Sequence, residues 1–197
     1  MNPAREPALD AAKSQLCGYF EEQSPAQAQL TFLGANPMSL LRFGPDGDGI
    51  VTYVTLGCSA EPMQDPNAMV LDLDNGPRAE LILPVKGGLD EVIRPLAMVA
   101  ASPTIEGLVL QRGALLDFGA PLWADSRFTG FVIVDSGIPA VAISAGSAAG
   151  NTIDFLQLVP ATTNEFALAR AKGVAELEAL WQTQGVDKAD PHRASAV

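Results

Sequence analysis

The chain has 197 residues, with 23 acidic and 12 basic side chains and a formal net charge of -11. This charge repels nucleic acids and anionic lipid surfaces and favours a basic partner, although an acidic surface also serves solubility alone. No stretch approaches the ~20 consecutive apolar residues of a membrane span, and no apolar run follows the N-terminal charges, so we expect a cytoplasmic protein that binds neither nucleic acid nor membrane.

The first quarter of the chain predicts one helix followed by strands. Residues 1–7 have the composition of a disordered lead-in, and residues 9–22 carry apolar side chains at helical spacing. Short apolar runs at 29–33 and 40–43 predict strands. Residues 50–57 alternate β-branched and aromatic side chains with threonine, which predicts a central strand.

The middle of the chain continues with a predicted hairpin and a second helix. Residues 70–74 and 78–83 flank Asn75-Gly76, a dipeptide that favours tight reversals. Apolar side chains at helical spacing predict a helix over 89–101, which begins after Leu89 because Pro95 suits a first turn. Further strands are expected at 108–110, 128–134 and 140–143, and residues 144–151 have the composition of a flexible connection.

The last third predicts a strand, a capped helix and a tail. Residues 153–159 are apolar on both faces, as in a strand buried on both sides, and Pro160 is expected to end it. Thr162 and Glu165 form a capping box, after which one helix with one buried stripe is expected to reach Gln184. Residues 186–197 have few apolar side chains and predict a disordered tail, so a single domain spans 8–185.

Residues for covalent catalysis are scarce in this sequence. His192 is the only histidine and lies in the predicted tail, so a Ser-His-Asp or Cys-His arrangement is not expected. Cys17 and Cys58 lie far apart in sequence, which favours reduced core residues over a disulfide and gives no zinc or iron site. The phosphate-binding and dinucleotide-binding glycine motifs are also missing from the sequence, so we expect no catalytic residues, no metal and no cofactor.

Two acidic, glycine-containing stretches resemble the start of a calcium loop. They are 46–49 and 72–76, and in each the position of the closing glutamate is occupied by another residue, Gly57 or Leu83. Both stretches are therefore interpreted as turns. Carboxylate pairs stay available for acid–base chemistry, because the chain has many acids, but their number does not identify a site.

Four residues are candidates for contact with a protein partner. Glu80 and its neighbour Arg78 are charges within an apolar strand, for which the solvent-facing side of a half-buried strand is the favoured interpretation. Trp123 and Asp125 lie in a turn-like segment. Trp123 could be a surface anchor, although a core position is the favoured interpretation.

Three segments together resemble the suppressor of fused family. They are Thr52–Ser59 (TYVTLGCS), Arg78–Leu83 (RAELIL) and Phe155–Pro160 (FLQLVP), the last followed by the helix that contains Glu165 and ends at Leu180-Trp181. Their order and spacing also match the family over most of residues 30–182. Cys58 and residues 61–69 depart from the usual sequence.

The resemblance implies an α/β (α+β) sandwich, with a mixed, mostly antiparallel sheet flanked by an N-terminal, a middle and a C-terminal helix. It also implies a non-catalytic protein-binding module. The animal member holds a transcription factor and has a second domain, whereas bacterial single-domain relatives are similar to immunity proteins that neutralise a cognate toxin. A carboxylate-dependent hydrolase and a homo-oligomeric scaffolding subunit are the alternative hypotheses, and the sequence leaves the oligomeric state open.

Overall fold

The computed structural model describes residues 5–31, 37–64, 76–143 and 152–197. The strands are β1 (Ala26–Leu30), β2 (Met38–Phe43), β3 (Ile50–Leu56), β4 (Arg78–Lys86), β5 (Leu115–Asp117), β6 (Phe128–Asp135), β7 (Val141–Ala142) and β8 (Thr152–Thr162). The helices are α1 (Arg5–Tyr19), α2 (Ile93–Glu106), α3 (Thr163–Lys172) and α4 (Val174–Thr183), with short 3-10 turns η1 (Cys58–Ala60) and η2 (Asp90–Val92).

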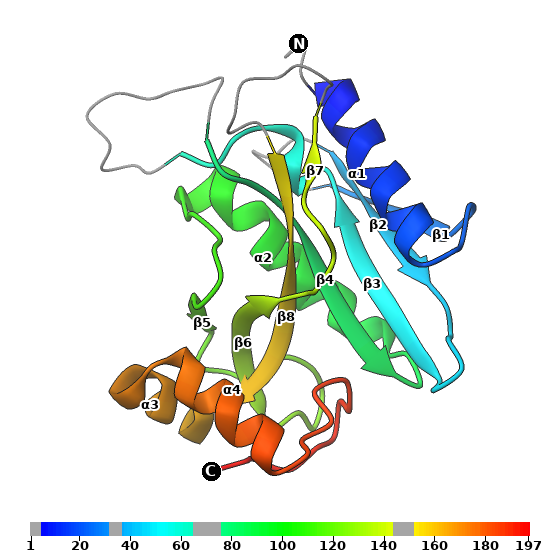
Figure 1. Cartoon of the computed structure of the whole chain (residues 1–197). Helices are drawn as coiled ribbons and strands as arrows, with labels where there is room; N and C mark the ends of the chain where they lie inside the picture. Colours follow the sequence, from blue (N-terminus) through cyan, green and yellow to red (C-terminus); the bar gives the residue numbers. More distant parts are fainter. Residues whose placement is uncertain (1–4, 32–36, 65–75, 144–151) are drawn as a thin grey trace.

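In the described part of the chain, eight strands form one mixed sheet. Their order is β1-β2-β3-β4-β8-β6-β5, with β7 pairing to the beginning of β8 (Figure 1). Only β4 and β8 run parallel among the described strand pairs. The predicted fold class, a mixed and mostly antiparallel sheet with helices, is confirmed.

Helices cover both faces of the sheet. The central strand β8 has apolar side chains on both of its faces, and each face is buried against a helix. Leu156 and Leu158 belong to the core cluster beneath α2. Phe155, on the opposite face, belongs to the cluster beneath α1, and Val159, on that same face, packs with α3 and α4. Figure 1 shows α2 behind the strands, α1 in front of them and the α3–α4 pair at their lower end. This alternation confirms that β8 is a strand buried on two sides.

The strand β8 is longer than predicted, because it passes through Pro160 and ends at Thr162. Beyond Gln157 this strand has no pairing with β4, while β6 still pairs with it as far as Thr162. A proline is tolerated where one side of a strand has no ladder partner. The prediction that Pro160 ends the strand is therefore wrong.

The prediction of one continuous C-terminal helix is also wrong, because Gly173 divides it into α3 and α4. Gly173 has φ 93° and ψ 158°, a conformation that side-chain-bearing residues rarely adopt. The predicted capping box is confirmed: the Thr162 hydroxyl accepts from the Glu165 backbone, and the Glu165 carboxylate accepts from the Thr162 backbone. The expected buried stripe is confirmed for Phe166 and Trp181.

The helix α2 starts at Ile93, after a short 3-10 turn, and Pro95 lies in its first turn as predicted. A second proline, Pro103, lies inside the helix and has no N–H to donate to the Val99 carbonyl. The hydroxyl of Ser102 donates to that carbonyl at 2.7 Å, which satisfies it. The helix therefore continues to Glu106 despite its internal proline.

The chain ends differ from the prediction. Residues 5–7 of the predicted lead-in are helical, and residues 186–197 are held against the body by a buried arginine, Arg193, so the prediction of an undocked tail is wrong. The segment 108–110 forms no strand, whereas β5 was not predicted. The predicted strand at 70–74 and the connection at 144–151 lie outside the described residues.

The acidic turn before β3 is a turn, as predicted. The Asp46 carboxylate accepts hydrogen bonds from the backbone N–H groups of Asp48 and Ile50 at 2.9 Å each. The side chain therefore stabilises the turn that it belongs to. The second acidic stretch, 72–76, lies almost entirely outside the described residues. In the described ranges, none of the helices combines the length and apolar content that a membrane crossing needs.

Gly130 provides a test of this architecture. It lies at a register shift between β6 and β8, and a Cβ at this position would collide with the backbone carbonyl of Leu116 in β5. We expect Gly130→Ala to lower the free energy of unfolding by about 2 kcal/mol, because the Leu116 backbone is part of the sheet and cannot easily move away from the added methyl group. Urea denaturation checks this, with Gly47→Ala as control, since a Cβ at Gly47 meets nothing within 4 Å. Equal stability of both variants would contradict the predicted packing.

Candidate functional site

Glu80 is a fully buried carboxylate at the start of β4. It accepts hydrogen bonds from the Thr55 hydroxyl at 2.6 Å, the Gly57 backbone at 2.8 Å, and the Ser59 backbone and hydroxyl at 3.1 and 2.6 Å. Burial raises the pKa of Glu80 above its ordinary value, while these hydrogen bonds act in the opposite direction. The carboxylate thus holds the end of β3 and the turn η1 against β4.

Arg78 is buried on the same strand and contacts the same turn. Its guanidinium donates to the Ser59 carbonyl at 2.9 Å, so Ser59 is bound by both buried charged residues of β4, Arg78 and Glu80. The interpretation of Arg78 and Glu80 as solvent-facing charges is wrong, because both are almost fully buried. Alternation alone could not reveal this, since η1 covers the side of β4 that would otherwise face solvent.

Cys58 lies beside this cluster, at a cavity of about 260 Å³ whose lining includes Met38 and Met63. Burial raises the pKa of the Cys58 thiol well above its ordinary value, and the nearby Glu80 carboxylate adds to the rise. A thiol in this state is a poor nucleophile, because only the thiolate reacts efficiently. His192, the one histidine of the sequence, is exposed in the C-terminal segment.

Across residues 5–31, 37–64, 76–143 and 152–197, no group of three His, Cys, Asp or Glu side chains could hold a metal ion. The two cysteines, Cys17 and Cys58, are buried free thiols.

A surface groove lies on the outer side of α2, and we call it the α2 groove. Its volume is about 360 Å³, and it is lined by Arg94, Pro95, Met98, Phe118, Ala120, Pro121 and Leu122. Two of its large apolar side chains are unusually open to solvent, with Met98 45% and Phe118 41% exposed. Ile105, two turns after Met98 on the same helix, is 53% exposed. Exposed apolar side chains that gather in this way are typical of an interaction surface.

Trp123 follows the wall of the α2 groove in sequence but is itself a core residue. It is only 6% exposed and packs on Phe128, with ring centroids 5.8 Å apart. The core interpretation of Trp123 is confirmed. Asp125, the fourth candidate, is exposed and adopts a positive φ of 57°.

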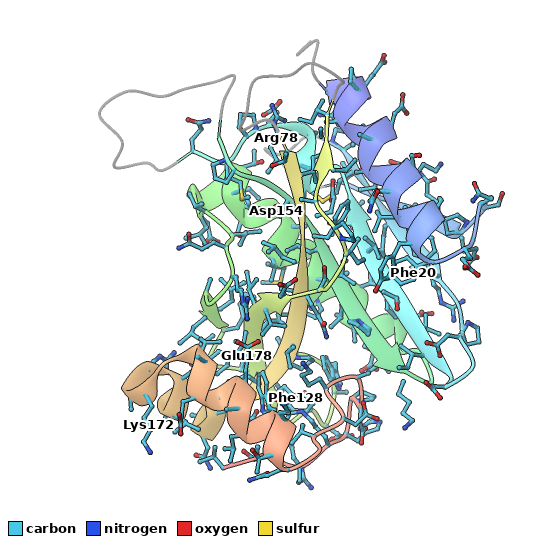
Figure 2. The ribbon with its side chains drawn as sticks, in the orientation of Figure 1. Phe20, Arg78, Phe128, Asp154, Lys172 and Glu178 are labelled. Carbon is cyan, nitrogen blue, oxygen red and sulfur yellow. The ribbon has the colours of Figure 1, made fainter. Side chains whose placement is uncertain are left out.

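Glu165 is the second fully buried carboxylate, at the other end of the sheet. It accepts from Trp181 Nε1 at 2.8 Å and from the Thr162 backbone at 2.8 Å. Arg193 donates to both of its oxygens, at 2.7 and 3.1 Å. Figure 2 shows Arg78 of the first cluster and Phe128, which lies beside Arg193, at opposite ends of the sheet.

The ion pair of Glu165 with Arg193 determines the charge state of Glu165. Burial alone would raise the pKa of Glu165, but the hydrogen bonds from Arg193, Thr162 and Trp181, together with the charge of Arg193, leave it below its ordinary value. The sequence predicted Glu165 as a helix cap only. Its partner Arg193 was missed because it lies 28 residues further along, in a segment of low apolar content.

The comparisons with known proteins agree with this architecture. The family model for Suppressor of fused protein (SUFU) matches residues 34–194. No curated protein matches the sequence significantly.

Three similar solved structures share the fold at low sequence identity. A SUFU (suppressor of fused protein) homologue from Neisseria gonorrhoeae FA 1090 has a TM-score of 0.69 and 21% identity, covering 98% of each chain. A chain of the Sufu-Fu complex has a TM-score of 0.71 and 16% identity, over 96% of this chain and 92% of that chain. Drosophila Suppressor of Fused has a TM-score of 0.71 and 15% identity, over 96% of this chain and 51% of that chain.

Replacement of Glu80 tests the hydrogen-bonded cluster of Glu80 with Thr55, Gly57 and Ser59. We expect Glu80→Ala to lower the free energy of unfolding by about 3 kcal/mol or more, because four donors, three of them buried, lose their acceptor and a cavity forms. Glu80→Gln should cost much less, since its amide oxygen can still accept from Gly57 and Ser59. Urea denaturation of both variants measures the difference. Equal losses in the two variants would show that the acceptor oxygen is unimportant.

Replacement of Glu165 tests the Glu165–Arg193 ion pair through the pH dependence of stability. A depressed folded-state pKa stabilises the protein above the unfolded-state pKa, and this stabilisation is lost as the pH falls through the folded-state pKa. At pH 7 we expect Glu165→Gln to lower the free energy of unfolding by about 3 kcal/mol, because Arg193 loses its counter-charge. The difference in the free energy of unfolding between wild type and variant should shrink as the pH falls below about 4.

Urea denaturation between pH 3 and 7 measures this gap. The exposed Glu176 on α4 provides the control variant, Glu176→Gln, which should follow the wild type at each pH. A gap that stays constant across this range would contradict an ionised Glu165 in the folded protein.

Proposed function

The chain belongs to the suppressor of fused family, and from this we propose that it is a non-catalytic protein-binding module that acts as an immunity protein, neutralising a cognate toxin by binding it in the cytoplasm. The α2 groove is the observation that carries the proposal. A monomeric surface rarely leaves large apolar side chains gathered around a groove unless another molecule covers them.

The buried chemistry of the molecule supports binding more than catalysis. Glu80 and Glu165 each have their oxygens occupied by several donors from the protein itself, and both are shielded from solvent. The Cys58 thiol is held neutral by its surroundings. These groups therefore serve the fold and are poorly placed to meet a substrate.

The charge of the chain supports a basic partner. A net charge of -11 accelerates the encounter with a cationic protein and makes the association rate depend on salt. The α2 groove would then receive a large apolar side chain of that protein, since Met98 and Phe118 both line it. In the Sufu-Fu complex, a relative of the same fold is bound to another protein, Fu.

Substitutions in the α2 groove test the proposal. We expect Met98→Glu to weaken binding of the partner about tenfold or more, because a charge would be buried in the apolar centre of the contact. Tyr19→Glu is the matched control, because Tyr19 is similarly exposed but lies on α1, over the opposite face of the sheet. Binding is measured with the partner captured by wild type from the native host and then purified.

A growth assay tests the immunity role separately. The reading frame next to the gene is expressed with wild type, Met98→Glu or Tyr19→Glu, and survival is counted. Wild type and Tyr19→Glu should protect, and Met98→Glu should not. If expression of the neighbouring reading frame alone is harmless, the immunity role is wrong. If wild type, Met98→Glu and Tyr19→Glu bind the partner equally well, the α2 groove is not the binding site.

A further inference from the structure

The C-terminal segment 186–197 places one buried side chain, Arg193, in the body of the protein. Arg193 is 7% exposed, whereas every other residue of this segment is half-buried or exposed. The segment also forms part-buried hydrogen bonds, between Ser195 and Thr162 at 2.8 Å and from the Ala196 backbone to Glu165 at 3.2 Å, and Val186 and Ala196 pack on the core beneath α4. The Lys86–Asp187 ion pair at 3.1 Å is exposed and contributes little to stability.

The guanidinium of Arg193 occupies a site that we call the arginine socket. The socket consists of the Glu165 carboxylate, the Pro160 carbonyl, which accepts at 2.7 Å, and the rings of Phe128 and Trp181. The guanidinium carbon lies 4.9 Å from the Phe128 centroid and 5.5 Å from the Trp181 centroid. A two-oxygen acceptor with aromatic rings around it matches a planar guanidinium and fits an ammonium group less well.

The body of the protein supplies the carboxylate and the rings of the arginine socket, and the tail adds one backbone hydrogen bond, from Ala196 to Glu165 at 3.2 Å. Trp181 and the backbone of Thr162 orient the Glu165 carboxylate from the core, and neither belongs to residues 186–197. Phe128 and Trp181 are fixed in the buried cores beneath α2 and α4. A preorganised site keeps its affinity for a guanidinium whichever chain supplies it.

We propose that the arginine socket is a recognition site for an arginine side chain of a protein partner, occupied in this structure by the chain's own Arg193. The tail acts as an internal competitor, and a partner arginine enters when the tail lifts away. The identity of the incoming chain rests on the proposed protein-binding function, and the net charge of -11 favours partners rich in arginine.

The test uses the full-length Arg193→Ala variant, in which the socket is empty, with N-acetyl-arginine amide as the probe. We expect this probe to bind the variant about tenfold more tightly than N-acetyl-lysine amide, because only the guanidinium can pair with both carboxylate oxygens. Adding Glu165→Gln to the variant should remove the preference. Chemical-shift titration by NMR measures each affinity.

The matched control is Arg112→Ala, because Arg112 forms ion pairs with Asp135 and Glu178 at the surface and is well exposed. It should give no binding of either probe. If Arg193→Ala is unfolded, the fraction refolded at increasing probe concentration replaces the titration, and the arginine probe should rescue folding where the lysine probe does not.

Equal binding or equal rescue by both probes, or a preference that survives Glu165→Gln, overturns the socket as an arginine site. Such a result leaves protein binding through the α2 groove standing. Failure to find a partner would remove the protein-binding function while leaving the response to the arginine probe unchanged, so the two failures are distinguishable.

Discussion

The buried carboxylate of Glu165, on α3, joins this helix to three other parts of the chain. It accepts from the Thr162 backbone at the end of β8, from Trp181 on α4, and from Arg193 and the Ala196 backbone in the C-terminal segment. Because the residue also caps α3, the direction of the helix and the position of the tail are set by the same side chain. Removal of such a group leaves several buried donors without an acceptor, which is far more costly than losing a surface contact.

The two buried carboxylates, Glu80 and Glu165, show how the surroundings decide the state of a similar group. Glu80 accepts from hydroxyls and backbone N–H groups, and its burial raises its pKa. Glu165 is equally inaccessible but faces the positive charge of Arg193, which holds its pKa below the ordinary value. One cluster closes the end of the sheet at η1, and the other closes the opposite end at the tail. The sheet between them carries the apolar cores.

This arrangement leaves large apolar side chains exposed on the outer side of α2. The buried charges are committed to the fold, whereas Met98 and Phe118 remain exposed beside a groove. A binding module of this kind needs a rigid scaffold and an uncovered apolar patch more than it needs reactive groups. The arginine socket would add a second point of contact in which charge and planarity provide the selectivity.

The sequence by itself determined the elements whose periodicity is strong and whose caps are local. The double-sided apolar run of β8 and the capping box of Thr162 and Glu165 are set by residues near one another in the chain, whereas the fold class followed from the resemblance of three separate segments to a known family. Only the tertiary structure decided that Arg78 and Glu80 are buried, that Gly173 divides the last helix and that Arg193 fixes the tail. The physical reason is distance along the chain: Glu80 is satisfied by residues more than twenty positions away and Glu165 by Arg193, and no local pattern records such partners.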